Sequence, residues 1–418
     1  GFASKWARLA DANGGIVPDN VGPSGMVGEL ISGKWYGGHY GWTWPLGFYV
    51  VQPALQVGGC NAALLSRDAS YLQLPRAQLD AVMERGQLLR FADSEMSLPA
   101  FWTHEERSLS TDTRTFMIPY RHDDSGWFDY QPPQVALVAS LWASSHQAAD
   151  WDRLIDLRSK CGYDWTPVYP FFTKSGGHEQ PWIEYLDDRN PNYPEAILSL
   201  THAAVCEQIR SIRGDTGDMR SVEASNIDDA VHQWQYVNPV LTEALVQLTM
   251  GGPQPIYYGG PLVTPLRHFD AERRRPGLPR DVAALVEQVD SEGVTVLLVN
   301  LSAFEERHDV IQAGGLREHS IRSASHDVAV EALPPAHYPG PTLTDRLQTT
   351  LDQPVILQVE APYLQVDLPP ATQVRIRLEI DWGASEPTYA FPWQAGDQHT
   401  PDTRRARLSN TEVVRRDD

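Results

Sequence analysis

Cysteine, lysine and long apolar runs are scarce in this 418-residue chain. The three cysteines, Cys60, Cys161 and Cys206, lack metal-type spacing, so we expect buried thiols and leave a single disulfide open. No apolar run approaches the roughly 20 residues that a membrane-spanning helix needs, which argues against a transmembrane protein. Lysine and arginine total 34 against 54 acidic residues, for a net charge of −20. Because phosphate contact needs a basic face, this charge argues against a nucleic-acid partner.

Familiar catalytic motifs are missing as well. The chain contains no HExxH zinc motif, no GxSxG nucleophile motif, no GxGxxG dinucleotide motif and no EF-hand loop. Function must therefore be sought in segments that match no standard motif.

Apolar residues recur with helical spacing through the first 252 residues. Helices are expected at 1–13, 48–66, 75–91, 133–149, 150–159, 195–215 and 227–252. Between them lie three aromatic segments without a regular period, at 14–47, 99–131 and 161–194. Long irregular segments in compact domains are usually functional. We therefore predict a helical domain over 1–252 that carries three functional loops.

The sequence pattern changes after Gly252. Residues 253–284 are rich in proline, glycine and arginine and are predicted to form a linker. From 285 to 395, short alternating or β-branched segments separated by Pro and Gly turns indicate an antiparallel β-sandwich. Residues 396–418 are polar and are predicted to be a loosely held tail. The predicted fold class is thus mainly α with an all-β second domain.

The strongest local signal is the segment Lys34–Trp44, which holds five aromatic residues, one lysine and one histidine between glycines. Aromatic faces stack on the C–H faces of sugar rings, and polar side chains bond the hydroxyl groups. The other two loops also place histidine beside carboxylates and aromatic residues. We predict substrate contacts from Asn20, Lys34, Trp35, Trp42, Trp44, Trp127, His178, Glu179 and Trp182. The alternative is that the aromatic residues only pack together beneath a loop.

Two chemistries fit these side chains. A polysaccharide lyase removes the proton next to a uronate carboxylate, which requires a base, an acid and a group that neutralises that carboxylate. The candidates for these roles are His39, Tyr40, Tyr36, His122 and Arg121. A glycosidase needs two carboxyl groups instead, and the candidates are Asp19, Glu29, Asp123 and Asp124. Lysine, histidine, tyrosine and arginine outnumber carboxylates in the richest loop, which favours the lyase slightly.

No cofactor is expected, and no residues are assigned as metal ligands. A structural Ca²⁺ held by Asp123, Asp124 and Asp129 is left open beside the simpler interpretation of a solvated acidic turn. The net charge of −20 suits an anionic substrate poorly. The lyase interpretation therefore requires Lys34, Arg121 and the histidines to make the site locally positive.

The segments NGGIVPDNVG at 13–22 and GKWYGGHYGWTWP at 33–45, followed by strands from residue 293, resemble the toroid-plus-sandwich carbohydrate-active enzymes. This group holds six-hairpin glycosidases and several families of polysaccharide lyase. The resemblance implies an (α/α) toroid with a sugar cleft at one end, followed by a β-sandwich. Fewer helices are expected here than six hairpins contain, so we expect an incomplete toroid or a piece of a longer chain. No catalytic residue is carried over from the resemblance.

We therefore expect an enzyme that cleaves a polysaccharide by β-elimination at uronic acid residues. The alternatives are a glycoside hydrolase, a non-catalytic carbohydrate-binding protein, and an enzyme that acts on a small metabolite. A polysaccharide partner favours a secreted or periplasmic protein, with a cytoplasmic location left open. Neither nucleic acid nor a membrane is an expected partner, and the oligomeric state is left open.

Overall fold

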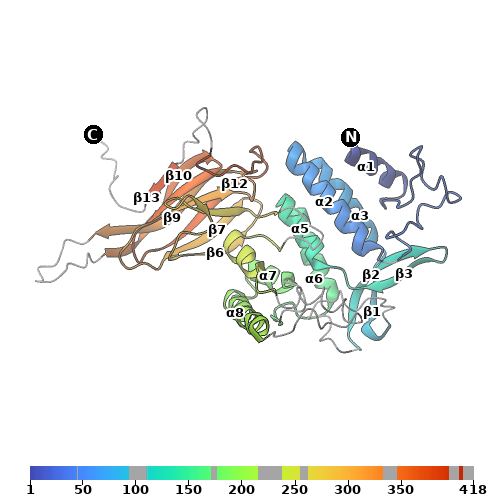
Figure 1. The fold of residues 1–418 in the computed structure, drawn as a ribbon, viewed down its shortest axis with the longest axis horizontal. Helices are drawn as coiled ribbons and strands as arrows, with labels where there is room; N and C mark the ends of the chain where they lie inside the picture. Colours follow the sequence, from blue (N-terminus) through green and yellow to red (C-terminus); the bar gives the residue numbers. More distant parts are fainter. Residues whose placement is uncertain are drawn as a thin grey trace, which may run out of the picture. The chain divides into compact units, whose positions relative to one another are not determined.

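The structure is a computed structural model that describes residues 1–44, 46–93, 110, 112–170, 177–214, 238–254, 262–332, 346–394 and 404–407. It divides into two compact units (Figure 1). The helical unit comprises Gly1–Val246 and Pro253–Pro261, and the β unit comprises Gln247–Gly252 and Leu262–Asp418. Helices and a small sheet make up the first unit and two larger sheets the second, so the fold is of mixed α and β type.

The helical unit contains eight α-helices among its described residues. They are α1 (Phe2–Ala12), α2 (Phe48–Ser66), α3 (Gln73–Met83), α5 (Val135–Ser145), α6 (Ala148–Cys161), α7 (Glu179–Leu186), α8 (Tyr193–Gly214) and α10 (Glu243–Leu245). Two 3-10 helices, η1 (Ala69–Leu72) and η2 (Phe91–Asp93), lie between them, together with an antiparallel sheet of β1 (Gln87–Arg90), β2 (Arg114–Asp123) and β3 (Gly126–Gln131). No helix in these described parts is long and apolar enough to span a membrane.

Helices α2 and α5 lie side by side and run in the same direction. Gln56 donates from Nε2 to the carbonyl oxygen of Leu137 at 2.7 Å. Further along both helices, the Cys60 thiol lies 3.1 Å from the Ser144 hydroxyl. Both helices are apolar on most sides, which is typical of helices enclosed by their neighbours.

Helices α3 and α6 form a second parallel pair that is held by ion pairs. Arg76 bonds both oxygens of Asp150, at 3.0 Å from Nε and 2.5 Å from Nη2. Further along, Arg153 bonds Asp80 at 2.7 Å. Since α3 follows α2 and α6 follows α5, each contacting its predecessor, the unit contains two helical hairpins in the same orientation.

Five predicted helices are confirmed, because the ranges 1–13, 48–66, 133–149, 150–159 and 195–215 correspond to α1, α2, α5, α6 and α8. The helix predicted at 75–91 ends at Met83, and the chain then enters β1. Residues 227–237 of the last predicted helix lie outside the described residues. Its described part contains α10 and the π-helical segment Val246–Met250.

The segment 99–131 contains a β-hairpin instead of the predicted loop, and its residues before 110 lie outside the described part. Strand β2 pairs with β3 and β1, and six consecutive residues, Thr115–Tyr120, are buried. A strand covered on both faces has no alternation of polar and apolar residues, so its sequence lacks the period of two. The predicted loop 161–194 likewise contains α7, whose eight residues are all buried, including the polar Glu179, Gln180 and Glu184.

The β unit contains two five-stranded sheets, with the orders β10-β9-β12-β7-β6 and β13-β11-β8-β4-β5. The strands are β4 (Leu266–Asp270), β5 (Arg275–Pro276), β6 (Val282–Val289), β7 (Gly293–Asn300), β8 (Arg307–Ala313), β9 (Ser320–Ala332), β10 (Arg346–Ala361), β11 (Tyr363–Leu368), β12 (Gln373–Asp381) and β13 (Arg404–Arg407). All pairings are antiparallel except that of β11 with β13. Strand β11 also contacts β9 and β10 of the other sheet.

The boundaries predicted for the second domain need two corrections. The predicted linker 253–284 contains β4, β5 and the start of β6, because its proline, glycine and arginine residues lie mostly around short strands. The predicted tail 396–418 contains β13, which extends a sheet by pairing with β11. The alternating segment at 373–381 is confirmed as the half-buried strand β12, whose buried residues are Val374, Ile376, Leu378 and Ile380.

Candidate functional site

Asp19 organises the glycine- and aromatic-rich loop before α2. Its carboxylate accepts hydrogen bonds from the backbone N–H of Gly38 at 3.2 Å and of Trp42 at 2.5 Å. Its own N–H donates to the carbonyl of Trp35 at 3.0 Å. A Cβ at Gly41 would lie 1.9 Å from the Asp19 carboxylate, so glycine permits this close approach. Burial raises the pKa of Asp19, although the backbone N–H groups partly oppose that rise. The contacts of Asp19 are therefore those of a structural carboxylate.

Asp19→Ala is expected to lower the free energy of unfolding by about 1–3 kcal/mol, because it leaves the N–H groups of Gly38 and Trp42 without their acceptor. Urea denaturation followed by tryptophan fluorescence measures this change. Glu29→Ala is the control, because Glu29 is exposed and, among the described residues, its carboxylate accepts hydrogen bonds only from Ser24. Equal losses of unfolding free energy in the two variants would contradict the assignment of Asp19 as a structural carboxylate.

An inner aromatic cluster joins this loop to the β2–β3 hairpin. It consists of Trp35, Tyr36, Trp42, His122 and Trp127. Trp42 is fully buried, its ring lies 5.3 Å from that of Trp127, and its Nε1 donates to the carbonyl of Val17 at 2.8 Å. The alternative interpretation of the aromatic segment, internal packing beneath a loop, therefore describes Trp42 well.

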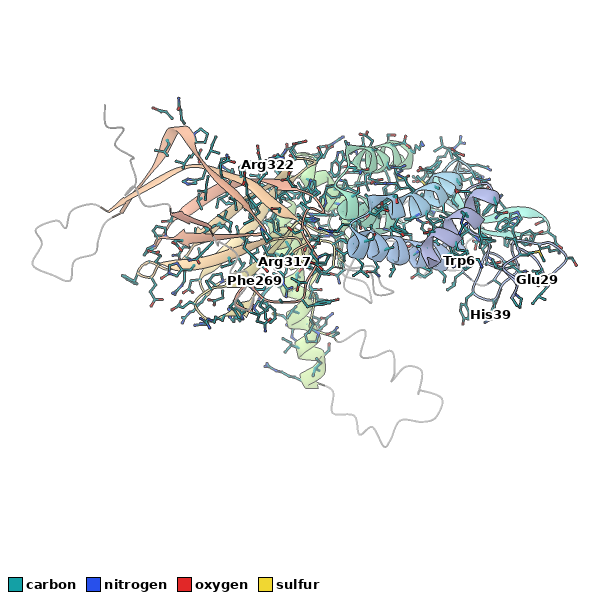
Figure 2. The ribbon with its side chains drawn as sticks, turned by 90° about the horizontal axis from the view of Figure 1, so that it is seen from above. Trp6, Glu29, His39, Phe269, Arg317 and Arg322 are labelled. Atoms are coloured by element: carbon teal, nitrogen blue, oxygen red, sulfur yellow. The ribbon has the colours of Figure 1, made fainter. Side chains whose placement is uncertain are left out.

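A second group, the outer aromatic surface, consists of His39, Tyr40 and Trp44. The ring of His39 lies 4.4 Å from that of Tyr40 and 5.1 Å from that of Trp44. Tyr40 is 55% exposed and Trp44 is 54% exposed. His39 is exposed too, on a loop at the periphery of the helical unit (Figure 2). These three rings are accessible to a ligand.

Polar side chains of the aromatic loop and of the β2–β3 hairpin meet beside the inner cluster. Lys34 Nζ contacts both carboxylate oxygens of Asp124 at 2.7 Å, and the Tyr36 hydroxyl donates to Asp124 at 3.0 Å. The hydrogen bond with Asp124 raises the pKa of Lys34, and the reverse contact lowers the pKa of Asp124. The same carboxylate raises the pKa of Tyr36, which makes this phenol a weaker candidate for a base.

Arg121 and His122 are engaged within the fold. The Arg121 guanidinium donates from Nε and Nη2 to the carbonyl of Thr43, at 3.1 and 2.8 Å, and lies over the ring of Phe128. The His122 ring lies 4.7 Å from the ring of Trp35 and 4.4 Å from that of Tyr36, and burial lowers its pKa. Its Nδ1 is buried without a hydrogen-bond partner in the part of the chain that the structure describes. His122 is therefore a neutral ring at neutral pH.

The remaining polar candidates have local partners. Glu29 accepts hydrogen bonds from the N–H and hydroxyl of Ser24, at 3.0 and 2.6 Å. Asp123 accepts two from Ser125 in the hairpin turn, and Asn20 donates to the carbonyl of Lys34 at 3.3 Å. Asp129 is buried and accepts a hydrogen bond from Gln131 at 2.8 Å. Asp19, Glu29, Asp123 and Asp124, the carboxylates considered for a glycosidase, thus each form hydrogen bonds with different residues.

The candidates from the third segment lie in the interior. His178, Glu179 and Trp182 are 2%, 4% and 0% exposed. His178 bonds the buried carboxylate of Glu243 at 2.8 Å through Nδ1 and the carbonyl of Tyr169 at 2.7 Å through Nε2. Glu243 is 65 residues away in the sequence, and no local pattern pointed to it. The structure does not bring these residues to the outer aromatic surface.

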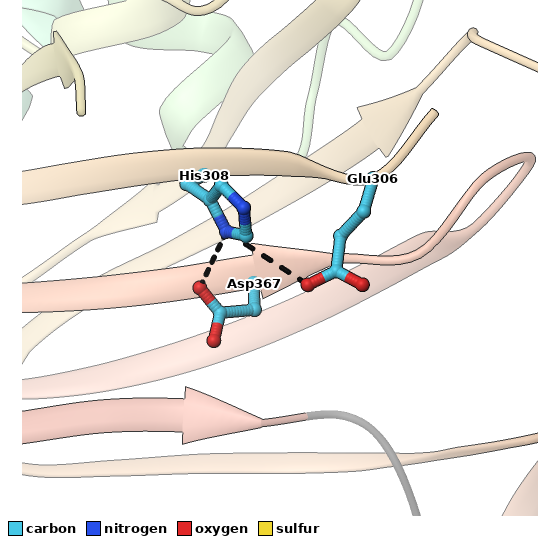
Figure 3. Close-up of side chains that lie close together, drawn as sticks. All are labelled: Glu306, His308 and Asp367. Carbon is cyan, nitrogen blue, oxygen red and sulfur yellow. Dashed lines mark hydrogen bonds and ion pairs between the residues drawn. The ribbon is translucent and has the colours of Figure 1, made fainter. Parts of the chain in front are cut away.

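One further group of potential cation ligands is found among the described residues, in the β unit (Figure 3). The ligand atoms of Glu306, His308 and Asp367 lie within 4.8 Å of one another. His308 and Asp367 are opposite each other on β8 and β11, and Nδ1 bonds the Asp367 carboxylate at 2.7 Å. A histidine–carboxylate hydrogen bond accounts for this arrangement without an ion.

The comparisons with known proteins concern mainly the helical unit. Residues 1–246 match a family described as a domain of unknown function (DUF8034). No curated protein and no solved structure matches the chain. The matched range covers more than half of the sequence and ends at the last residue of the main segment of the helical unit. The chain therefore belongs to the DUF8034 family.

Proposed function

We propose that the helical unit binds a carbohydrate chain on the outer aromatic surface. The observation that carries this proposal is the exposure of His39, Tyr40 and Trp44 in mutual contact. Burial of an aromatic ring releases free energy, and a ring that stays exposed to water does not gain it. A cluster of exposed rings therefore commonly marks a binding site. Each ring offers an apolar face for a sugar and a polar edge for its hydroxyl groups.

The backbone of Tyr40 supports the same conclusion. Its φ angle is +57°, a left-handed conformation that is unfavourable for a large non-glycine residue. Such strain persists only where the surrounding structure imposes it, and here the Asp19 hydrogen bonds to Gly38 and Trp42 flank the residue. We interpret the strain as the cost of presenting the tyrosine ring to solvent.

The helix arrangement is consistent with the proposed class of ligand. The α2–α3 and α5–α6 hairpins have the same orientation, as in an (α/α) toroid, and the aromatic loop and the β2–β3 hairpin directly precede the adjacent parallel helices α2 and α5. An incomplete toroid with a sugar site at one end is therefore our proposal for the architecture. A polysaccharide ligand also agrees with a secreted or periplasmic location.

Catalysis at this surface is a second candidate function. The observation in its favour is the contact of the His39 and Tyr40 rings, which places a potential base and acid together. A β-elimination would need a further group to neutralise a uronate carboxylate. Lys34 and Arg121, the residues suggested for that role, already have partners, so binding has the better support.

The double variant Tyr40→Ala/Trp44→Ala tests the proposal. We expect glycan affinity to fall by more than about tenfold, because loss of central aromatic anchors typically costs about 2 kcal/mol or more. Affinity electrophoresis and calorimetry on a panel of polysaccharides measure the change. Tyr389→Ala is the matched control, since Tyr389 is 84% exposed but lies in the β unit.

The same panel separates binding from turnover. Release of unsaturated ends that depends on His39 and Tyr40 would show a lyase, and release of reducing ends alone would show a hydrolase. Binding without either product is the result that we expect from a carbohydrate-binding protein. Equal affinities for the wild type and the double variant would reject the outer aromatic surface as the site.

A further inference from the structure

Lys34 and Arg121, the two cationic candidates of the aromatic loop and the β2–β3 hairpin, already have partners. Lys34 contacts both oxygens of Asp124 at 2.7 Å. Arg121 donates two hydrogen bonds to the carbonyl of Thr43, the residue directly before Trp44. In each case a negative or electron-rich oxygen of the protein occupies the position that a ligand carboxylate would take.

The exposed or partly exposed carboxylates of these segments add negative charge. Glu29 is exposed, Asp123 is partly exposed, and the Asp124 side chain is 71% exposed. Burial lowers the pKa of His122, so its ring adds no positive charge at neutral pH. The outer aromatic surface itself carries no carboxylate, lysine or arginine, because it consists of His39, Tyr40 and Trp44. A polyanion would approach these carboxylates on a chain whose net charge is −20.

We propose that the ligand of the outer aromatic surface is an uncharged polysaccharide and not a uronate-containing one. This inference rests on the proposed carbohydrate-binding function. Stacking on Tyr40 and Trp44 needs no charge. The Lys34–Asp124 pair with the Tyr36 hydroxyl offers donors and acceptors that suit sugar hydroxyl groups.

A binding panel with two classes of probe tests this inference at neutral pH. Unsubstituted β-glucan and mannan are the neutral probes, and polygalacturonate and alginate are the anionic ones. The full-length wild type is expected to bind at least one neutral probe, with little dependence on salt, and neither anionic probe. Tyr40→Ala/Trp44→Ala is expected to lose the neutral binding.

A charge substitution gives an independent readout. Asp124→Asn releases Lys34, so affinity for polygalacturonate or alginate should rise severalfold and should fall again with added salt. Asp123→Asn removes the same charge from the adjacent residue, but its carboxylate bonds Ser125 and not Lys34. It is expected to leave the affinity for anionic probes low.

Three outcomes distinguish the inference from the function on which it rests. Neutral binding that requires Tyr40 and Trp44, with a gain of anionic binding in Asp124→Asn alone, supports both. Stronger, salt-sensitive binding of the anionic probes by the wild type, lost in Tyr40→Ala/Trp44→Ala, overturns the inference but keeps the carbohydrate-binding function. Failure to bind any probe overturns the proposed function and the inference with it.

Discussion

Asp150→Ala is expected to lower the free energy of unfolding of the helical unit by about 3–5 kcal/mol. The variant leaves the Arg76 guanidinium, which is 5% exposed, without the carboxylate that it bonds at 2.5 and 3.0 Å. Ser145 and Arg153 also lose their bonds to Asp150. The large effect arises because a buried charge without a partner is far more costly than the net value of the pair.

Urea denaturation of the full chain measures this effect, and hydrogen exchange of the α3 and α6 peptides assigns it to the helical unit. Asp156→Ala is the control on the same helix. Its carboxylate bonds Lys160 at 2.6 Å but is 55% exposed, so the expected change is within about 0.5 kcal/mol. Arg76→Met/Asp150→Leu should recover most of the stability, because it removes both charges and keeps the volume. A double variant as unstable as Asp150→Ala would show that packing, and not the unpaired charge, causes the loss.

Asp309→Ala is expected to have a similar effect, about 3–5 kcal/mol, in the β unit. His268 is buried on β4, where Nδ1 lies 2.7 Å from the Asp309 carboxylate and Nε2 lies 2.9 Å from the carbonyl of Thr249. Both partners are acceptors, so both ring nitrogens must donate and the ring must be an imidazolium. Without Asp309 this charge is buried with only a carbonyl to stabilise it.

The His268–Asp309 pair also predicts that the stability of the β unit depends on pH. Burial alone lowers the pKa of His268, but the Asp309 carboxylate and the Thr249 carbonyl raise it above its ordinary value of 6.5. The protonated ring therefore stabilises the β unit fully below pH 6.5, and this contribution is lost as the pH rises through the higher pKa of the folded state. Hydrogen exchange of the β4 peptide across this pH range measures the loss.

Two variants separate the charge from other effects. Asp309→Asn keeps the size of the side chain and one hydrogen bond, so it should lose less stability than Asp309→Ala and should flatten the pH dependence. Glu379→Ala in the same unit removes an exposed partner of Arg322 and should change stability by about 1 kcal/mol or less. An unchanged pH dependence in Asp309→Asn would contradict the role of the pair.

Periodicity indicated most of the helices and strand β12, but it missed strand β2 and helix α7. Strand β12 alternates between buried and exposed positions, and its sequence shows the same period. Six residues of strand β2 and all eight residues of helix α7 are buried, so neither element has a continuous exposed face to reveal its period. The physical reason is that a sequence period reports burial on one side, not secondary structure itself.

The candidate site shows the same limit at the level of single residues. Trp42 and Trp44 are two positions apart in one aromatic segment, and both were predicted to contact substrate. Trp42 is fully buried against Trp35 and Trp127, whereas Trp44 is 54% exposed beside His39. Their residue type and neighbourhood in the sequence are nearly the same, so only the contacts made in the folded chain separate them.

The sequence by itself determined the order of a helical and a β-rich part, the net charge of −20 and the concentration of aromatic residues before α2. These properties depend on composition and on neighbours within a few positions. Tertiary structure alone decided which rings face solvent and whether Lys34 carries an available charge, because its partner Asp124 is 90 residues away. Exposure and pairing are set by residues that are distant in the chain, and no local pattern contains them.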